Sequence, residues 1–241
     1  MQFRFPRIGN TGFGNTGAGM IQQRKLSVGR WAAIVIDADS AADFGNAAPE
    51  NAIPAAIRRR MGRLERLAVR CTLGVLDGKG GTDELVFCSR HGNVETLVTL
   101  LRSISAGEPM SPMAFSGSVH NAAPGLVGQI YKERLSHTAL AAGNTTFAAG
   151  LVECYARLAT GESRDVTLTF ADIRLPDPYL AFEDEDVPGI AIALRLTLAV
   201  AGGQAAPVSP GRTGAFELLD RLKAGAEQIA IDALSRSEAA S

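Results

Sequence analysis

The segment Thr138-Ala139-Leu140-Ala141-Ala142-Gly143 joins two stretches of different periodicity and decides the fold class. Ser136 to Ala142 has the pattern of a short strand that ends in a turn of small residues. Thr145 to Ala159 then repeats apolar side chains at three- and four-residue steps, which predicts an amphipathic helix. We therefore expect Leu140 at a strand end, immediately before the N-terminus of a helix.

The bulk composition is that of one globular domain. The chain has 241 residues, of which 46% are hydrophobic and 20% charged, with a formal net charge of -1. Because it has no net positive charge and no long basic block, we expect no nucleic-acid partner. No apolar run approaches the roughly 18 residues of a membrane span, so none is expected, and Met1 to Gln23 lacks the apolar core of a secretory signal.

The cysteines and histidines are few and scattered. Cys71, Cys88 and Cys154 form no C-x-x-C pair, which argues against a disulfide framework and a structural zinc. The three histidines (His91, His120 and His137) lack the helical spacing of metal ligands. We expect a cytoplasmic protein without a metal or another cofactor.

Strands alternate with helices along most of the chain. The pattern predicts five strands, at residues 31–36, 85–88, 136–142, 166–170 and 190–200, and main helices at 55–76, 94–107, 145–159 and 216–234, with a short small-residue helix before residue 136. Asn93 is expected to cap the second main helix, and the prolines at 109 and 112 are expected to prevent helix there. This order predicts an α/β fold with a mostly parallel five-stranded sheet and helices on both faces, its last two strands antiparallel.

We divide the chain into four parts on this basis: a flexible Gly-rich leader (1–28), the main domain (29–200), a Pro/Gly linker (201–214) and a C-terminal helix (215–241). The leader contains Gly12-Phe13-Gly14-Asn15-Thr16-Gly17, a literal G-x-G-x-x-G. A dinucleotide site needs a buried strand before this motif and a helix after it, and no strand pattern precedes it here. We therefore interpret it as part of the leader.

Four segments carry a resemblance to a known family: 57–64, 87–92, 111–122 and 138–151. In this order they resemble the N-terminal half of the thiolase-like condensing enzymes, and more narrowly the standalone ketoacyl-synthase-like N-terminal domain proteins of aryl polyene and xanthomonadin-type pigment clusters. The resemblance spans roughly residues 28 to 200, and Ser118-Val119-His120-Asn121-Ala122 is its most specific stretch. It implies a thiolase-like half domain.

The departures from this family are as informative as the matches. In ketoacyl synthases the 138–143 segment reads Thr-Ala-Cys-Ala-Ser-Gly, and its cysteine is the nucleophile, whereas this chain has Leu140. Leucine has no lone pair with which to attack a thioester. The family also takes two histidines, or a histidine and an asparagine, from a second thiolase half. We expect no autonomous condensation by this chain.

The resemblance implies an inactive accessory protein, similar to a chain length factor, for polyene-type polyketide or fatty-acid synthesis. In the family, the strand bearing Ala139 and Leu140 pairs across the dimer axis. We expect either a heterodimer with an active ketoacyl synthase or a homodimer in which two copies mimic one thiolase unit. The residues expected at the acyl tunnel or the interface are Phe115, Ser118, His120, Asn121, Ala139, Leu140 and Phe147.

Two other readings stay open. One is a module that binds an acyl-carrier protein or an acyl chain, with Arg58, Arg59, Arg60 and Arg63 on one helix facing the acidic carrier. The other is a thioester hydrolase or acyltransferase that uses Ser118 or Ser136 with a histidine.

The remaining candidates receive structural interpretations. Two residues apart in extended chain, Ser118 and His120 lack the strained turn of a nucleophilic serine, so we expect His120 to bond backbone carbonyls. Cys88 is expected to be buried and inert. Asp172, Asp177 and the run from Glu183 to Asp186 form an acidic group that could bind a cation, and we interpret it as a solvated loop.

Overall fold

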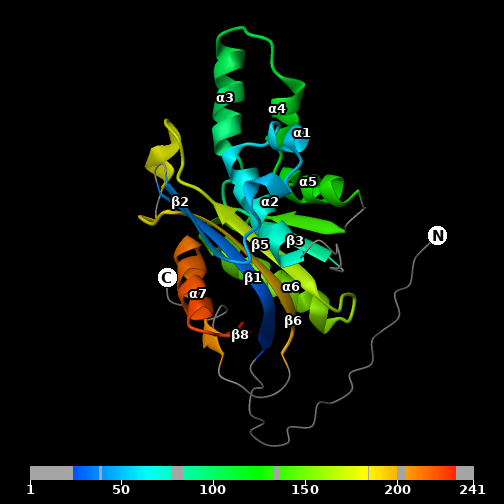
Figure 1. The fold of residues 1–241 in the computed structure, drawn as a ribbon. Coiled ribbons are helices and arrows are strands. Elements are labelled where there is room, and N and C mark those ends of the chain that lie inside the picture. The colour runs from blue at the N-terminus through cyan, green and yellow to red at the C-terminus, as the bar shows by residue number, and fades with distance from the viewer. Residues whose placement is uncertain are drawn as a thin grey trace, which may run out of the picture.

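An eight-stranded mixed sheet forms the centre of the molecule (Figure 1). The computed structural model describes residues 24–37, 40–76, 84–132, 136–183, 185–199 and 205–231. The strands are β1 Lys25–Asp37, β2 Ser40–Gly45, β3 Glu84–Cys88, β4 His137–Leu140, β5 Val166–Asp172, β6 Gly189–Leu198, β7 Ala206–Pro207 and β8 Gln228–Ala230. Their order is β4-β3-β5-β6-β1-β8-β7, and β2 pairs with β1.

The α/β class is confirmed, but the expected strand count and direction are wrong. All five expected strands are present, and β2, β7 and β8 are additional. Only β3 with β4, β3 with β5, and β7 with β8 pair in parallel; the other four pairings are antiparallel. The antiparallel contact of β5 and β6, which no α-helix separates in the chain, is as expected.

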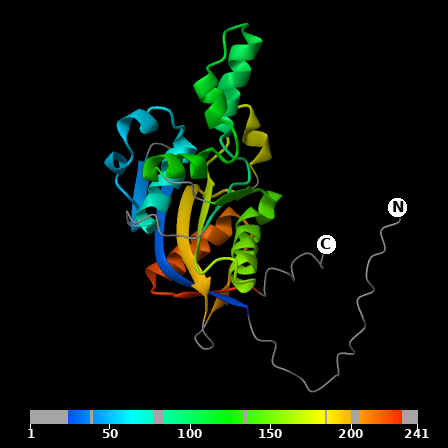
Figure 2. The same cartoon turned by 90° about the vertical axis from the view of Figure 1, so that its right-hand side faces the viewer.

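Helices cover both faces of the sheet (Figure 2). They are α1 Ala55–Arg58, α2 Arg63–Leu76, α3 Val94–Ser105, α4 Pro112–Gly117, α5 Ala122–Tyr131, α6 Thr146–Ala159 and α7 Arg212–Lys223, with 3-10 turns η1 Glu50–Ala52, η2 Gly143–Thr145 and η3 Tyr179–Phe182. Helices α2 and α5 pack on one face, and α6 and α7 on the other.

Side-chain alternation along the strands builds one core on each face. On β3, Leu85 and Phe87 join the core beneath α2 and α5, whereas Val86 and Cys88 join the core beneath α6 and α7. Both cores are closed to solvent, so β3 is buried along its whole length. A strand covered on both faces reads as a continuous apolar run, which is why the sequence revealed it.

Two helix predictions need correction in the first half of the chain. The expected helix at 55–76 is divided into α1 and α2 by a turn at Arg59–Gly62. A short helix, α4, forms in the proline-rich segment where none was expected. Pro112 takes the first helical position, where its missing N–H is not needed, and Ser111 Oγ accepts from the amide of Ala114 at 3.3 Å.

The C-terminal segment also differs from the prediction. Helix α7 begins at Arg212 and ends at Lys223, and Gly225 then adopts a left-handed φ of 89°. Beyond this turn, β8 pairs with the start of β1, which itself begins at Lys25. The C-terminal helix therefore begins and ends earlier than expected, and the ordered domain begins before residue 28. Both differences arise because β8 pairs with the start of β1.

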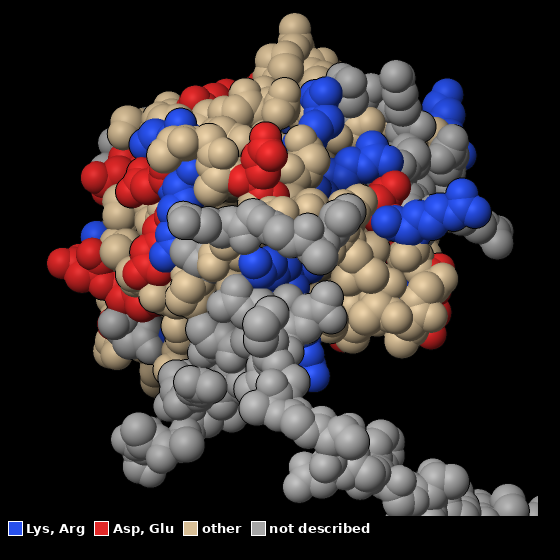
Figure 3. All heavy atoms as spheres, turned by 90° about the horizontal axis from the view of Figure 1, so that it is seen from below, with Lys and Arg blue, Asp and Glu red and all other residues tan. Residues whose placement is uncertain are grey.

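Several predictions concern residues outside the described ranges. These are residues 1–23 of the leader, with the Gly12–Gly17 motif, Asp184 of the acidic run, residues 201–204 of the linker, and everything after residue 231. Among the described helices, none is long and apolar enough to cross a membrane. The face seen from below carries both basic and acidic groups, so no field of one sign covers it (Figure 3).

Candidate functional site

Leu140 ends β4 at the edge of the sheet, and the turn that follows leads into α6. Three side-chain hydrogen bonds hold this turn. Thr146 Oγ1 accepts from the amide of Ala142 at 2.9 Å and donates to the Gly143 carbonyl at 2.6 Å, while Thr145 Oγ1 donates to the Ala142 carbonyl at 2.7 Å. Gly143 has a φ of 58°, a conformation that favours glycine. The sequence prediction of strand, turn and helix is therefore confirmed.

The Leu140 side chain is half-buried and packs against the core on the α6 side of the sheet. Phe147 is fully buried in that core, with its ring centroid 5.2 Å from that of Phe170. Phe115 lies on α4 and is 57% exposed. Leu140, Phe147 and Phe115 were expected at the same tunnel or interface, but they have different environments. Phe115 faces solvent, Phe147 is a core residue, and Leu140 packs against that core.

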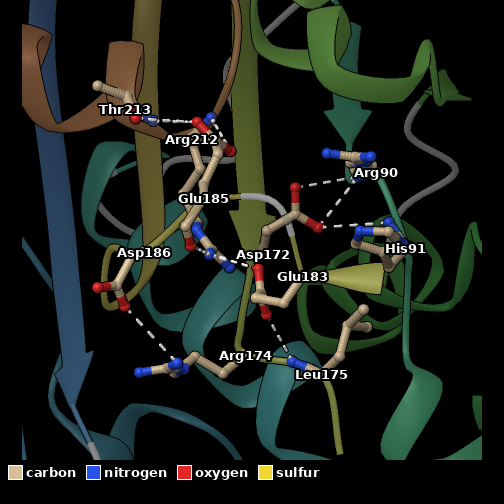
Figure 4. Close-up of polar contacts among 10 residues, drawn as sticks. All are labelled: Arg90, His91, Asp172, Arg174, Leu175, Glu183, Glu185, Asp186, Arg212 and Thr213. Carbon is tan, nitrogen blue, oxygen red and sulfur yellow. Dashed lines mark hydrogen bonds and ion pairs between the residues drawn. The ribbon is translucent and has the colours of Figure 1, made fainter. Parts of the chain in front are cut away.

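A buried carboxylate holds the loop at Arg90 and His91 (Figure 4). Asp172, at the end of β5, accepts from Ser89 Oγ at 2.8 Å and from the amide of Arg90 at 3.0 and 3.1 Å. It is 4% exposed, and burial raises its pKa to about 6 against the opposing effect of these hydrogen bonds. The amide of Ser89 donates to the Leu140 carbonyl at 3.4 Å, so Asp172 supports the strand end through one intervening residue.

His120 contacts the same loop. Its Nε2 lies 2.8 Å from the Ser89 carbonyl oxygen, and its ring meets Phe87 edge-on at 5.5 Å. The backbone contact expected from the sequence is therefore present. Ser118 Oγ donates instead to the Phe115 carbonyl at 2.8 Å, so the hydroxyl and the imidazole are not directed at each other.

Ser136 is directed at a carboxylate and not at a histidine. Its hydroxyl lies 3.4 Å from Glu84 Oε1, and Glu84 is paired with Arg157. Arg157 also contacts Glu153 and donates to Thr138 Oγ1 at 2.9 Å. This ion-pair group ties α6 to the edge strand and was not identified from the sequence, because its members are far apart in the chain.

Asn121 is exposed and lines a surface hollow of about 280 Å³ between α4 and α5. Arg60 and Gln129 also line this hollow, together with His137 at the start of β4. The hollow therefore reaches from α4 to the edge strand. Asn121 makes no capping hydrogen bond to α5 through its side chain.

The four arginines proposed for a carrier protein do not lie on one helix. Arg58 ends α1 and donates to the Glu50 carbonyl at 3.0 Å, Arg59 and Arg60 are in the turn, and Arg63 begins α2 at 3.9 Å from Glu95. The expectation of a single basic helix face is wrong. Charge-mediated binding by these residues stays a prediction.

The three cysteines are buried and unpaired, as Cys88 was expected to be. Burial raises the pKa of each thiol above its ordinary value. Cys88 lies on β3 in register with Leu140, yet it faces the closed core beneath α6. A buried thiol in a non-polar environment stays protonated and is a poor nucleophile.

The acidic residues expected to form a solvated loop instead divide into two groups. Asp177 and Asp186 are exposed, but Glu183 pairs with Arg212, which is 3% exposed. Glu185 accepts from the amides of Arg212 and Thr213, both at 2.9 Å, and so caps α7 (Figure 4). No group of residues suited to a metal ion was found in the described ranges.

The model of the beta-ketoacyl synthase N-terminal domain matches residues 31–228. The chain belongs to the beta-ketoacyl synthase N-terminal domain family. A search of curated proteins found no match.

Solved structures of ketosynthases share the fold of this family member. One is the ketosynthase (ApeO) in complex with its chain length factor (ApeC) from Xenorhabdus doucetiae, with a TM-score of 0.68 and 23% identity over 84% of this chain and 92% of that chain. A second is the ishigamide ketosynthase/chain length factor, with a TM-score of 0.57 and 16% identity over 75% and 64% of the two chains.

A third is a beta-ketoacyl synthase from Burkholderia phymatum, with a TM-score of 0.54 and 14% identity over 73% of this chain and 59% of that one. The ketosynthase-like chain thus spans under two thirds of the second and third structures and nearly all of the first. At these identities the likeness establishes the thiolase-like α/β fold.

Proposed function

We propose that this chain is a catalytically inactive, ketosynthase-like accessory subunit that acts by pairing with an active ketosynthase, in the manner of a chain length factor. The observation that carries the proposal is Leu140. The strand, turn and helix that would present the family's cysteine are built in full, with a leucine side chain in its place. The scaffold is kept and the nucleophile is absent.

The environments of Cys88, Ser118 and His120 argue against each of them as a replacement nucleophile. Cys88 is buried in the core, Ser118 is bonded to a backbone carbonyl, and His120 contacts the Ser89 carbonyl. These contacts argue against the hydrolase alternative. They agree with a subunit whose contribution is shape, in a polyene- or fatty-acid-type synthase as the sequence resemblance implies.

The edge strand provides a surface for pairing. Within the described residues, β4 pairs only with β3. The carbonyl of Ser136 accepts from the amide of Leu85 in β3, and that of Leu140 accepts from the amide of Ser89, which directly follows β3. Because backbone groups alternate in direction along a strand, the amide and carbonyl of Ala139 point to the outer edge. A strand edge of this kind can pair with a strand of another subunit.

Ala139→Pro tests this pairing. The substitution removes an outward N–H but no hydrogen bond to β3, so the fold is expected to persist while the complex with a polyene-type ketosynthase weakens at least about tenfold. Ala139→Ser keeps the amide and serves as the matched control. Binding is measured by light scattering and titration calorimetry. Equal affinities of the two variants would exclude β4 as the pairing edge.

The first structural match supports a ketosynthase partner over self-association. That structure is a ketosynthase in complex with its own chain length factor. We therefore propose a heterodimer for this chain. A stable homodimer at micromolar concentration, unaffected by added ketosynthase, would favour the self-paired alternative.

A further inference from the structure

Helices α3 and α4 form an arm, residues 94–117, that stands away from the sheet (Figures 1 and 2). Within the arm α3 packs mainly against α4. Six of the eleven exposed large apolar side chains of the described residues lie on it: Leu97, Leu101, Ile104, Met110, Met113 and Phe115. Apolar groups exposed in this number usually mark a protein interaction surface.

Both ends of the arm meet at one buried amide side chain. Asn93 is 5% exposed and immediately precedes α3. Its Oδ1 accepts from the amide of Thr96 at 3.2 Å and caps α3, and its Nδ2 lies 3.3 Å from the carbonyl of Gly117, the last residue of α4. A single side chain therefore joins the first turn of α3 to the last residue of α4.

A buried carboxylate connects this amide to the body of the domain. Glu65, in the first turn of α2, is 2% exposed and accepts from Asn93 Nδ2. Its pKa is raised by burial, while the bond from Asn93 opposes that shift. A carboxylate is costly to bury, and the bond from Asn93 to Oε1 offsets part of that cost, whereas Oε2 is buried without a hydrogen-bond partner.

The neighbouring turn leaves space for this contact. A Cβ on Gly62 would lie 2.6 Å from Glu65 Oε2 and 2.7 Å from Asn93 Nδ2. Any larger residue would therefore displace the carboxylate or the amide. The interruption between α1 and α2, which the helical periodicity did not predict, places this glycine beside the pair.

We propose that Glu65 and Asn93 form a clasp that sets the direction of the arm and so positions its apolar surface for the partner subunit. The partner in this inference rests on the proposed function, whereas the clasp itself does not. Glu65 and Asn93 are positioning residues in this account. They act through the arm and are not expected to touch the partner.

Asn93→Asp separates the clasp from the helix cap. Aspartate still accepts from the Thr96 amide, but in its ionised form it donates neither to Glu65 nor to the Gly117 carbonyl, and it places a second carboxylate beside Glu65. Amides of the arm are expected to exchange hydrogen about tenfold or more faster, since hydrogen bonds to charged groups are among the stronger ones. Amides of β3, β5 and β6 should keep their protection.

The double variant Glu65→Gln with Asn93→Asp reverses donor and acceptor. The glutamine amide can donate to the aspartate, while the Gly117 carbonyl stays without its donor, so exchange in the arm should be at least about threefold slower than in Asn93→Asp without reaching the parent rate. Glu65→Gln alone retains an acceptor for Asn93 and should leave the arm protected. Unchanged exchange in Asn93→Asp, or a loss of protection spread evenly over the sheet without rescue, would overturn the clasp.

A binding measurement then connects the clasp to the partner. With a polyene-type ketosynthase, Asn93→Asp is expected to weaken the complex several-fold, and the double variant to restore part of that affinity. Parent affinity in Asn93→Asp despite a loosened arm would overturn the role of the arm in pairing. If the parent chain itself forms no complex, the proposed function fails, while hydrogen exchange still decides the clasp.

Discussion

At the scale of single residues, Leu140 carries the functional conclusion. Its side chain is half-buried against the core beneath α6, where a polar nucleophile would instead need access to substrate. The hydrogen bonds of Thr145 and Thr146 maintain the turn without any contribution from residue 140. The substitution can therefore abolish chemistry while the local fold is kept.

Asp172 gives a residue-scale prediction about pH. Its folded pKa is raised from 3.8 to about 6, so the folded state binds this proton more tightly than the unfolded state. Its contribution to stability is present at low pH and is lost as pH rises through about 6. We compare the unfolding free energy of the parent chain with that of Asp172→Asn. When the pH is lowered from 7.5 to 5, the difference between the two should change by about 1–2 kcal/mol in favour of the parent chain.

Urea denaturation of both proteins across this pH range measures the shift. The variant is the appropriate reference because other titrating groups are common to both chains and cancel. A difference that stays constant with pH would contradict a raised pKa at Asp172.

The sequence indicated the position of Leu140 but not the surroundings of Asp172. Leu140 lies in a contiguous strand, turn and helix, so local pattern was sufficient. Asp172 acquires its partners from the loop after β3, 82 residues away in the case of Arg90, and the clasp joins Glu65 to Asn93 across 28 residues. Such buried polar contacts depend on tertiary packing, which periodicity does not report.

At the scale of elements, buried strands were predicted well and exposed or very short ones were missed. Strand β3 is wholly buried and reads as an apolar run, whereas β2 is almost entirely exposed and resembles a loop. Strand β8 has three residues and was absorbed into a predicted helix. Hydrophobic periodicity needs both length and burial, and neither β2 nor β8 provides both.

The contact of α6 with β3 supplies a prediction at this scale. A Cβ on Gly150 would lie 2.6 Å from Cys88 Sγ and 3.0 Å from Leu168 Cδ1, so Gly150→Ala should cost about 1–3 kcal/mol of unfolding free energy. Gly125, in α5, has no atom within 4 Å of that position. Gly125→Ala should therefore be neutral or stabilise by up to about 1 kcal/mol.

Both glycines lie inside helices, so Gly125→Ala controls for the backbone effect of adding a methyl group. Chemical denaturation followed by circular dichroism compares the two variants. Equal stabilities would show that α6 does not approach β3 as closely as described.

At the scale of the whole molecule, the alternation of strands and helices was sufficient for the α/β class but not for the sheet order. Because β1 lies between β6 and β8, the two ends of the domain meet in one sheet. The open edge at β4 and the apolar arm lie on either side of the hollow between α4 and α5. This arrangement offers a partner one extended surface.

The central claim is that this chain pairs with a ketosynthase and accepts no acyl group itself. Intact-protein mass spectrometry, after incubation with an acyl-carrier-protein thioester and an active polyene-type ketosynthase, tests it most directly when combined with light scattering. We predict acyl mass on the ketosynthase, an unchanged mass for this chain, and a complex of the two. A covalent acyl adduct on this chain would contradict the account.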